Sequence, residues 1–513
     1  MFKGHPKGLL AAALANMGER FGFYTMMAIL VLFLQAKFGL SGTHAGIIYS
    51  IFYALIYILA LVGGFIADRT RNYKGTIMVG LFIMAFGYFL LSIPTPTPVP
   101  NKVLYLTMVC IGLFVIAFGN GLFKGNLQAL VGKMYDNAEY SKMRDSGFSL
   151  FYMFINVGAI FAPLFAVGIR NWWVSHNGFQ YSADLPALCH AQLGGTLSPE
   201  AAARFSELAT TANNGAPVAD LTTFANEYLN VFTTGYHYAF AIAIGAMAIS
   251  IAIYMVNKKN FPGLEKPKAG EKAAIDPNEI KMSAQEIRQR ITALFAVFAV
   301  VIFFWFSFHQ NGLTLTMFAK EFTDLSGIEF DLGFVKIVGA EIFQSINPLF
   351  VVLLTPVIMA IFGFLRARNI EPSTPKKIAI GMFIAAMGFV VMAIGSFGLP
   401  THNEVVEMGS LPQAQRVTPF LLIGTYFILT VAELFISPLG ISFVSKVAPP
   451  QYQGVMQGGW LSATAIGNQL LFIGAIFYEN IPVWATWVVF VTACLISMGT
   501  MLAMLKWLER VSK

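Results

Sequence analysis

Residues 240–256 read FAIAIGAMAISIAIYMV, an apolar stretch without a charged side chain. A helix of about 20 apolar residues crosses the hydrocarbon core of a bilayer, so this stretch predicts a membrane span. Similar stretches lie at 77–93, 378–394 and 484–505. Of the 513 residues, 57% are hydrophobic and 12% are charged, whereas a soluble domain has about 25% charged residues. The sequence therefore predicts an all-α membrane protein and excludes a soluble multidomain protein.

The apolar stretches predict about twelve transmembrane helices in two groups of six. Residues 1–256 form the expected N-terminal bundle, residues 257–288 a cytoplasmic linker, and residues 289–513 the C-terminal bundle. In transporters built from two such halves, the substrate site lies near the bilayer midplane between them. The expected bounds of the spans are 9–36, 43–67, 75–95, 102–133, 147–170, 236–256, 289–320, 334–366, 376–398, 417–447, 453–478 and 483–508.

The positions of Lys and Arg predict the orientation, because cytoplasmic loops carry an excess of these residues. Basic residues outnumber acidic ones in the linker, whereas Arg204 is the only Lys or Arg in the outer segment 171–235. We therefore expect the outer segment outside the cell and both termini in the cytoplasm. The net charge of +7 is explained by this topology and does not indicate a nucleic-acid partner.

Motifs of other function classes are missing from the sequence. There is no His-Glu-x-x-His zinc pattern, which argues against a metal centre or an enzyme, and no Gly-x4-Gly-Lys-Ser/Thr loop for ATP. Cys189 is the only cysteine of the outer segment, so no disulfide framework is expected. Two short patterns, SPEA at 198–201 and SAQE at 283–286, are typical of helix starts.

The second expected span ends in GGFIADR at 63–69, and a lysine follows five residues later. Glycines let neighbouring helices approach closely, and an acid followed by bases at a helix end can bind a neighbouring helix. Ordinary interfacial charge is the alternative explanation. With the twelve-span layout, the motif resembles the loop signature of the major facilitator superfamily, which implies that fold. The residues of this candidate cytoplasmic-gate motif are Gly63, Gly64, Asp68, Arg69 and Lys74.

Charged or titratable side chains also lie inside the apolar spans. They are Glu19, Arg20, Lys124, His309 and Glu433. A charge at the centre of the bilayer costs roughly 2.5–3.5 kcal/mol on insertion scales, so such residues usually have a function. The alternative is a buried ion pair that only holds helices together.

Several strings in order resemble the proton-dependent oligopeptide transporter family over nearly the whole chain. Only the outer segment and the linker fall outside the resemblance. The family adds two helices between the halves in most bacterial members, and this linker is too short and polar for them. The strings are NMGERF at 16–21, FYMFINVG at 151–158, FQSINPLF at 343–350, ELFISP at 433–438, GW at 459–460 and AIGN at 465–468.

The resemblance implies proton-driven uptake of di- and tripeptides by a symporter in the plasma membrane, here a bacterial inner membrane. It implies a monomer that needs no cofactor and uses the proton gradient as its energy source. Its partners would be short peptides, protons and the lipid bilayer. The implied proton-coupling residues are Glu19, Arg20, Lys124 and, in place of the usual glutamate, His309. The implied substrate-binding residues are Arg20, Tyr24, Tyr57, Lys124, Asn156, Asn347, Glu433 and Trp460.

The chain departs from the family pattern at several of these places. Asn16 stands where the first-span motif has a glutamate, Met27 where an arginine is usual, and Phe23 where the pocket has a tyrosine. In the family, the missing arginine and the glutamate replaced by His309 pair as an outer gate. Glu341, just before the string at 343–350, is a possible added acid.

Two hypotheses follow from these departures. His309 replaces the missing carboxylate as a titratable gate, because an unperturbed histidine titrates near pH 6.5; the alternative is a neutral, hydrogen-bonded histidine. Met27 weakens the grip on a free carboxylate, so the substrate could also be a modified peptide, an amino-acid conjugate or an organic anion. A receptor that binds without transport remains a further class, recognisable by tight binding without flux.

Overall fold

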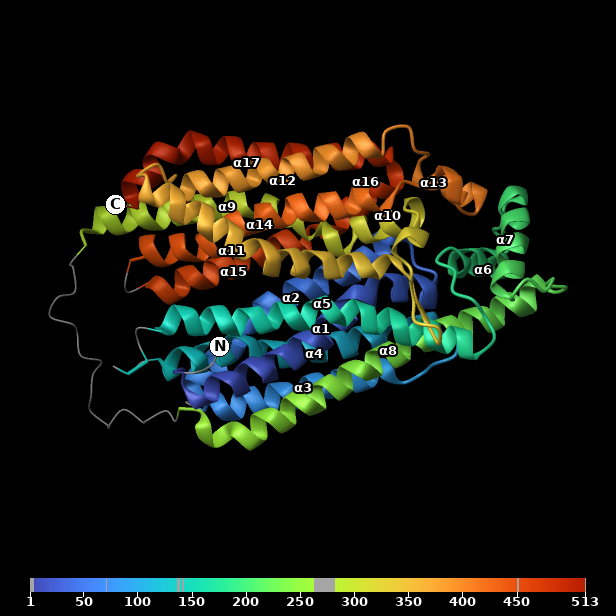
Figure 1. Cartoon of the computed structure of the whole chain (residues 1–513), viewed down its shortest axis with the longest axis horizontal. Coiled ribbons are helices and arrows are strands. Elements are labelled where there is room, and N and C mark those ends of the chain that lie inside the picture. Colours follow the sequence, from blue (N-terminus) through green and yellow to red (C-terminus); the bar gives the residue numbers. More distant parts are fainter. Residues whose placement is uncertain are drawn as a thin grey trace.

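A computed structural model describes residues 4–70, 72–135, 139–140, 143–262, 282–449 and 452–512, apart from the side chains at 68, 144–146, 445, 453 and 454. Within these residues, twelve helices are long and apolar enough to cross a membrane, as the sequence predicts. They run roughly parallel in two groups, which contain the earlier and the later part of the chain (Figure 1).

The first group contains six long helices that pack mainly on one another. They are α1 (Lys7–Phe38), α2 (Gly42–Thr70), α3 (Tyr73–Ser92), α4 (Lys102–Met134), α5 (Arg144–His176) and α8 (Leu221–Asn257), and a short 3-10 turn, η2 (Lys258–Asn260), follows α8. The helix α8 begins well before the expected residue 236. Asp220 caps it by accepting hydrogen bonds from the backbone N–H groups of Thr222 and Thr223, so the polar start of α8 projects beyond its apolar part.

The second group also has six spans, three of which consist of more than one helical element. It comprises α9 (Ala284–Phe308), η3 (His309–Gly312) and α10 (Thr314–Phe322); η5 (Ala340–Ser345) and α11 (Ile346–Ala367); α12 (Thr374–Gly395); α14 (Pro419–Val447); α15 (Gln453–Gln469) and α16 (Leu471–Asn480); and α17 (Val483–Val511). The eighth span begins at η5 and not at residue 334. The residues before it form η4 (Leu325–Ile328) and a small antiparallel pair, β1 (Phe330–Asp331) and β2 (Lys336–Ile337).

Short helices gather at the end of the molecule opposite the C-terminus, which we call the cap end (Figure 1). They are α6 (Leu185–Gly194) and α7 (Pro199–Ala212) of the outer segment, and α13 (His402–Met408) and η6 (Gln413–Gln415) between α12 and α14. The helix start expected at residue 198 is confirmed, because the Ser198 hydroxyl accepts a hydrogen bond from the Ala201 N–H. The outer segment is therefore a helical cap.

The helix start expected in the linker is also confirmed. The Ser283 hydroxyl accepts a hydrogen bond from the Glu286 N–H, and α9 begins at Ala284. The last residues of the expected linker therefore belong to the seventh span. Residues 263–281, which hold most of the linker's basic side chains, lie outside the described residues.

Candidate functional site

A buried carboxylate in the middle of α1 is held by three hydrogen bonds. Arg20 donates from Nε to Oε2 of Glu19 (2.5 Å) and from Nη2 to Oε1 (3.0 Å), and Asn120 of α4 donates from Nδ2 to Oε1 (2.8 Å). The side chains of Glu19 and Asn120 are fully buried. A two-pronged Arg–carboxylate pair of this kind is strong and fixes both side chains. The structure therefore brings the expected pair together and adds Asn120 to it.

Lys124 of α4 lies near this pair without joining it. Its ammonium is within Coulombic range of Glu19 and Arg20, and its Nζ lies 4.8 Å from the centre of the Tyr57 ring. Among the described residues, the ammonium makes no hydrogen bond or ion pair. Contact with an aromatic face compensates a cation only partly, so Lys124 remains available to an anion.

Three of the residues that depart from the family pattern lie on the same helix as Glu19 and Arg20. The guanidinium of Arg20 lies 5.0 Å from the centre of the Phe23 ring, so the ring that replaces a tyrosine packs against the cation. The side-chain nitrogen of Asn16 is buried and finds no partner within the described part of the chain. Met27 is buried in the hydrophobic core. Neither Asn16 nor Met27 supplies the charge that its counterpart in the family pattern carries.

A second polar cluster lies in the other half, where α14 packs on α11. Asn347 donates from Nδ2 to Oε2 of Glu433 (2.9 Å) and to the Thr430 hydroxyl (2.9 Å). Glu433 is only half-buried. With one amide as its hydrogen-bond donor, this carboxylate can accept further donors. The structure thus brings Glu433 and Asn347 together as the resemblance implies.

Aromatic side chains lie between the two charged clusters. Tyr24 and Tyr57 are each within Coulombic range of Arg20 in one half and Glu433 in the other. Trp460 of α15 is buried in the C-terminal half, where its indole packs directly on Gly440 of α14. Tyr24 and Tyr57 are therefore influenced by the cation of one half and by the carboxylate of the other.

His309 lies where α9 gives way to η3. Its Nδ1 is 2.5 Å from Oδ1 of Asn468, and its ring stacks on Trp305 with centroids 4.8 Å apart. The ring of Tyr53, from α2 in the other half, lies at the same centroid distance of 4.8 Å. His309 thus touches both halves while its hydrogen bond stays within its own half.

Asn156 of α5, another of the implied substrate-binding residues, has its hydrogen bond within its own helix. Its side-chain amide donates to the backbone carbonyl of Tyr152, in its own helix (3.2 Å). Among the described residues it makes no hydrogen bond to Asn347 or Glu433, and it is half-buried. Its amide oxygen is therefore left for another donor.

The two glycines of the motif at 63–69 have different surroundings. A Cβ on Gly63 would overlap the carbonyl oxygen of Gly121 in α4, whereas a Cβ on Gly64 would meet nothing within 4 Å. Lys74 donates to the backbone carbonyls of Lys258 (3.3 Å) and Phe261 (2.5 Å), at the end of α8. Arg69 is exposed, and the side chain of Asp68 lies outside the described residues.

Sequence reasoning missed two amides that position the charged groups. Asn468 ends the AIGN string at 465–468 and Asn120 lies in the fourth expected span, but neither has a predicted role. The available signal was a polar amide inside an apolar span. Asn120 lies close to Lys124 along the chain, whereas Asn468 lies close to His309 only across the bundle. Across the described residues, no group of three or more His, Cys, Asp or Glu side chains could hold a metal ion.

Comparison with known proteins identifies relatives over almost the full chain. A peptide transporter of Yersinia enterocolitica is 28% identical over 487 residues, which cover 91% of this chain and 87% of that protein. A dipeptide and tripeptide permease B of Shigella dysenteriae is 25% identical and covers 99% and 96%. A di-/tripeptide transporter of Lactococcus lactis is 26% identical and covers 91% and 89%.

The fold is that of solved transporter structures. A peptide transporter POT in complex with sulfate superposes with a TM-score of 0.72 at 23% identity, over 100% of this chain and 96% of that chain. A POT family transporter in complex with 5-aminolevulinic acid gives a TM-score of 0.70 at 21% identity, over 100% and 98%. The family model described as the POT family matches residues 74–272 and 264–488. The chain therefore belongs to the POT family.

Proposed function

We propose that this protein is a proton-coupled symporter that moves di- and tripeptides or peptide-like solutes by alternating access. One observation carries the proposal: Arg20 in the N-terminal half and Glu433 in the C-terminal half are both within Coulombic range of the same two tyrosines, Tyr24 and Tyr57. A peptide at neutral pH has a carboxylate at one end and an ammonium at the other. The relatives with names that state a substrate are peptide or di-/tripeptide transporters.

The two ends of the substrate would meet different halves of the protein. Lys124, which has no ion-pair partner in the described part of the chain, would bind the substrate carboxylate. Glu433, with Asn347 holding one of its oxygens, would bind the ammonium. A substrate that bridges the halves favours the state in which the two halves are close, which is how binding energy would drive the conformational change. Tyr24, Tyr57, Asn156 and Trp460 would line the site.

Glu19 is the residue that we assign to proton coupling. A proton on its carboxylate removes the charge that Arg20 binds, so the guanidinium loses its two strong hydrogen bonds. Arg20 is then free to join Lys124 on the substrate carboxylate. When the proton leaves, Arg20 returns to Glu19 and the substrate loses a partner. His309, which touches Tyr53 across the halves, is proposed as a second titratable group.

The test is uptake into proteoliposomes with an imposed proton gradient, comparing Glu433→Gln with Glu207→Gln. Glu207 is exposed on α7 and pairs with Arg204 in its own helix, so it is a matched control. Removing one partner of a desolvated ammonium–carboxylate contact costs about 2 kcal/mol or more, which lowers kcat/KM roughly 30-fold or more. Uptake that is equal in the two variants would contradict the role of Glu433.

A second candidate function is transport of another organic solute with altered proton coupling. Arg20 is engaged by Glu19 and Met27 carries no charge, so Lys124 is the cation left for a free carboxylate. A competition assay with free and C-terminally amidated dipeptides separates the two functions. Equal inhibition favours the second candidate, whereas strong preference for the free carboxylate excludes it.

We further propose that the cap end faces the outside of a bacterial inner membrane, with both termini in the cytoplasm. The outer segment of the cap contains a single Lys or Arg, as expected for an outside segment. We propose a monomer that works without a cofactor, since each charged cluster is assembled within one half of one chain.

A further inference from the structure

A buried ion pair joins the two halves at the cap end. Arg170, in the last turns of α5, donates from Nη1 to Oε1 of Glu341 in η5. Both side chains are 0% exposed. The arginine belongs to the fifth span and the glutamate to the start of the eighth, so the pair crosses between the N-terminal and C-terminal halves.

The surroundings of this pair come from both halves and hold it in one geometry. Tyr236 of α8 accepts from Arg170 Nη1 (3.1 Å) and donates to Glu341 Oε1 (3.2 Å). The guanidinium lies 4.4 Å from the centre of the Tyr181 ring in the outer segment. Oδ1 of Asn171 accepts a hydrogen bond from Arg170 Nε, and Nδ2 of Asn171 donates to the backbone carbonyls of Lys336 (2.8 Å) and Val338 (2.9 Å).

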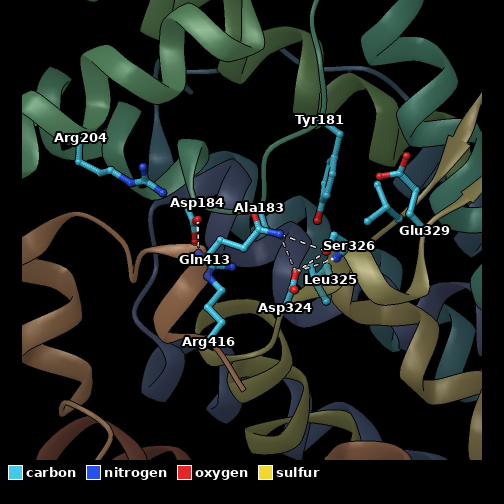
Figure 2. A pocket seen from close by; sticks show the side chains of 11 residues that line it. Tyr181, Ala183, Asp184, Arg204, Asp324, Leu325, Ser326, Glu329, Gln413 and Arg416 are labelled. Atoms are coloured by element: carbon cyan, nitrogen blue, oxygen red, sulfur yellow. Dashed lines mark hydrogen bonds and ion pairs between the residues drawn. The ribbon is translucent and has the colours of Figure 1, made fainter. Parts of the chain in front are cut away.

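The pair adjoins a wider contact between the cap and the C-terminal half. Figure 2 shows a pocket in this contact. Its volume is about 260 Å³, and the residues that line it include Tyr181 and Val338, which both contact Arg170. Tyr181, Asp184 and Arg204 line it from the outer segment, and Asp324, Gln413 and Arg416 line it from the other half. Asp184 and Arg416 form a second ion pair across this seam at 2.6 Å. Between α2 and α16, Thr43 donates to Glu479.

We infer that the Arg170–Glu341 pair is a latch whose two buried charges compensate each other while the cap end is closed and must part once in every transport cycle. The inference rests on the proposed alternating access, although not on the identity of the substrate. Since the pair joins the halves, it is not needed to build either half. Opening the cap end separates the two charges and lets water reach both. Glu341 and Arg170 are therefore gating residues of the transport cycle.

Physical chemistry sets the sign of the effect of breaking the pair. A buried pair as a whole contributes little, because desolvation offsets attraction, but removing one partner leaves the other charge buried without compensation. Glu341→Gln leaves the charge of Arg170 buried and uncompensated, and water solvates Arg170 only when the cap end opens. The variant should therefore shift the population towards the state open at the cap end. Arg170→Gln together with Glu341→Gln removes both charges and should largely restore the closed state.

The experiment measures how fast a membrane-impermeant maleimide reacts with a cysteine placed in the closed seam. Ala475 of α16 is fully buried and faces Gly46 of α2 across the halves, so Ala475→Cys reports opening. Cys110 and Cys189 are replaced by alanine. Cys494, buried within the C-terminal half, is kept to report unfolding. Glu207→Gln is the control, since this cap carboxylate pairs within its own helix.

We expect Glu341→Gln to raise the rate at position 475 roughly tenfold or more, with Cys494 silent. The double variant should return towards the rate of the control. A rate equal to that of Glu207→Gln would overturn the latch, and so would equal labelling of Cys494, because the pair would then only maintain the fold. Labelling needs neither substrate nor protons. Absent uptake by the unmodified protein would defeat the proposed function, and absent acceleration in Glu341→Gln would defeat the latch alone.

Discussion

Glu19, Glu433 and Lys124 are buried to different degrees and are compensated to different degrees. Glu19 accepts three hydrogen bonds, two of them from a cation. Glu433 accepts one from an amide, and Lys124 contacts an aromatic ring. Glu433 and Lys124, which are less compensated, gain most from binding a ligand. Glu19, which is fully compensated, loses most of its interactions when it is protonated. This difference is our reason for assigning substrate binding to Lys124 and Glu433 and coupling to Glu19.

His309 allows a direct test of its proposed role as a titratable gate. If a charge on this ring opens the contact with Tyr53, His309→Gln should flatten the dependence of uptake on pH. The measurement is initial uptake rate against pH at a fixed membrane potential. His237→Gln is the matched control, because His237 is also buried in a span and its hydrogen bond, to Leu91 O, stays within its own half. An unchanged profile in His309→Gln would leave the alternative of a neutral, structural histidine.

The sequence predicted the candidate residues better than their partners. Glu433 and Asn347 are found together, and so are Glu19 and Arg20, because the strings that contain them resemble those of a known family. Asn120 and Asn468 were missed because an amide carries no charge that would single it out in an apolar span. Arg170 was missed for another reason: it stands at the expected end of a span, where an arginine is ordinary. Only the fold brings it to Glu341.

At the scale of helices, α2 and α4 approach each other closely because both carry glycine at the contact. Gly63 faces the backbone of Gly121, and a Cβ on Gly121 would in turn overlap Leu59. Asn126 strengthens this contact by donating from Nδ2 to the Gly63 carbonyl (3.0 Å). The contact fixes α4, and with it Lys124, relative to Tyr57 on α2.

Gly63→Ala should therefore lower stability, and Gly64→Ala should not. The added methyl at residue 63 would force the helices apart. Overpacking of this kind typically lowers the free energy of unfolding by about 1–3 kcal/mol. The neighbouring site has open space around it. We expect a lower melting temperature in detergent and weaker uptake for Gly63→Ala alone. Equal melting temperatures for the two variants would contradict the close packing of α2 on α4.

The number and order of spans could be predicted from hydropathy, but several interruptions could not. The seventh span is continuous by composition, yet α9 ends at Phe308 and the chain turns through η3. Likewise, α8 begins at Leu221 because of the Asp220 cap, in a stretch too polar to be recognised as part of a span. Apolar length reports what crosses the bilayer. It does not report where polar side chains redirect the backbone or where a helix extends beyond the membrane.

At the scale of the whole molecule, the charge distribution and the cap predict the same orientation. In a background without Cys110, Cys189 and Cys494, Glu200→Cys on α7 should react with an impermeant maleimide added outside intact cells. Lys259→Cys in η2, at the opposite end, should react only after the cells are permeabilised. Both positions are exposed, so accessibility to the reagent depends on the side of the membrane alone. The reverse pattern would contradict the orientation proposed for the two termini.

The two halves contact each other through α2 with α15 and α16 and through α5 with η5 and α11. At the cap end they are joined by Arg170–Glu341, Asp184–Arg416 and Thr43–Glu479. Lys124, Asn156 and Glu433 remain only half-buried in this closed arrangement of the cap end. Alternating access requires a site between two halves that is closed at one end by contacts that can separate.

The most direct measurement of the central claim, that proton movement drives this transporter through Glu19, is substrate accumulation in proteoliposomes with an inward proton gradient. The unmodified protein and the Glu207→Gln control should accumulate a dipeptide above the external concentration, and only while the gradient lasts. Glu19→Gln should still exchange labelled for unlabelled dipeptide across the membrane but should not concentrate it. Accumulation by Glu19→Gln against a gradient would contradict the account.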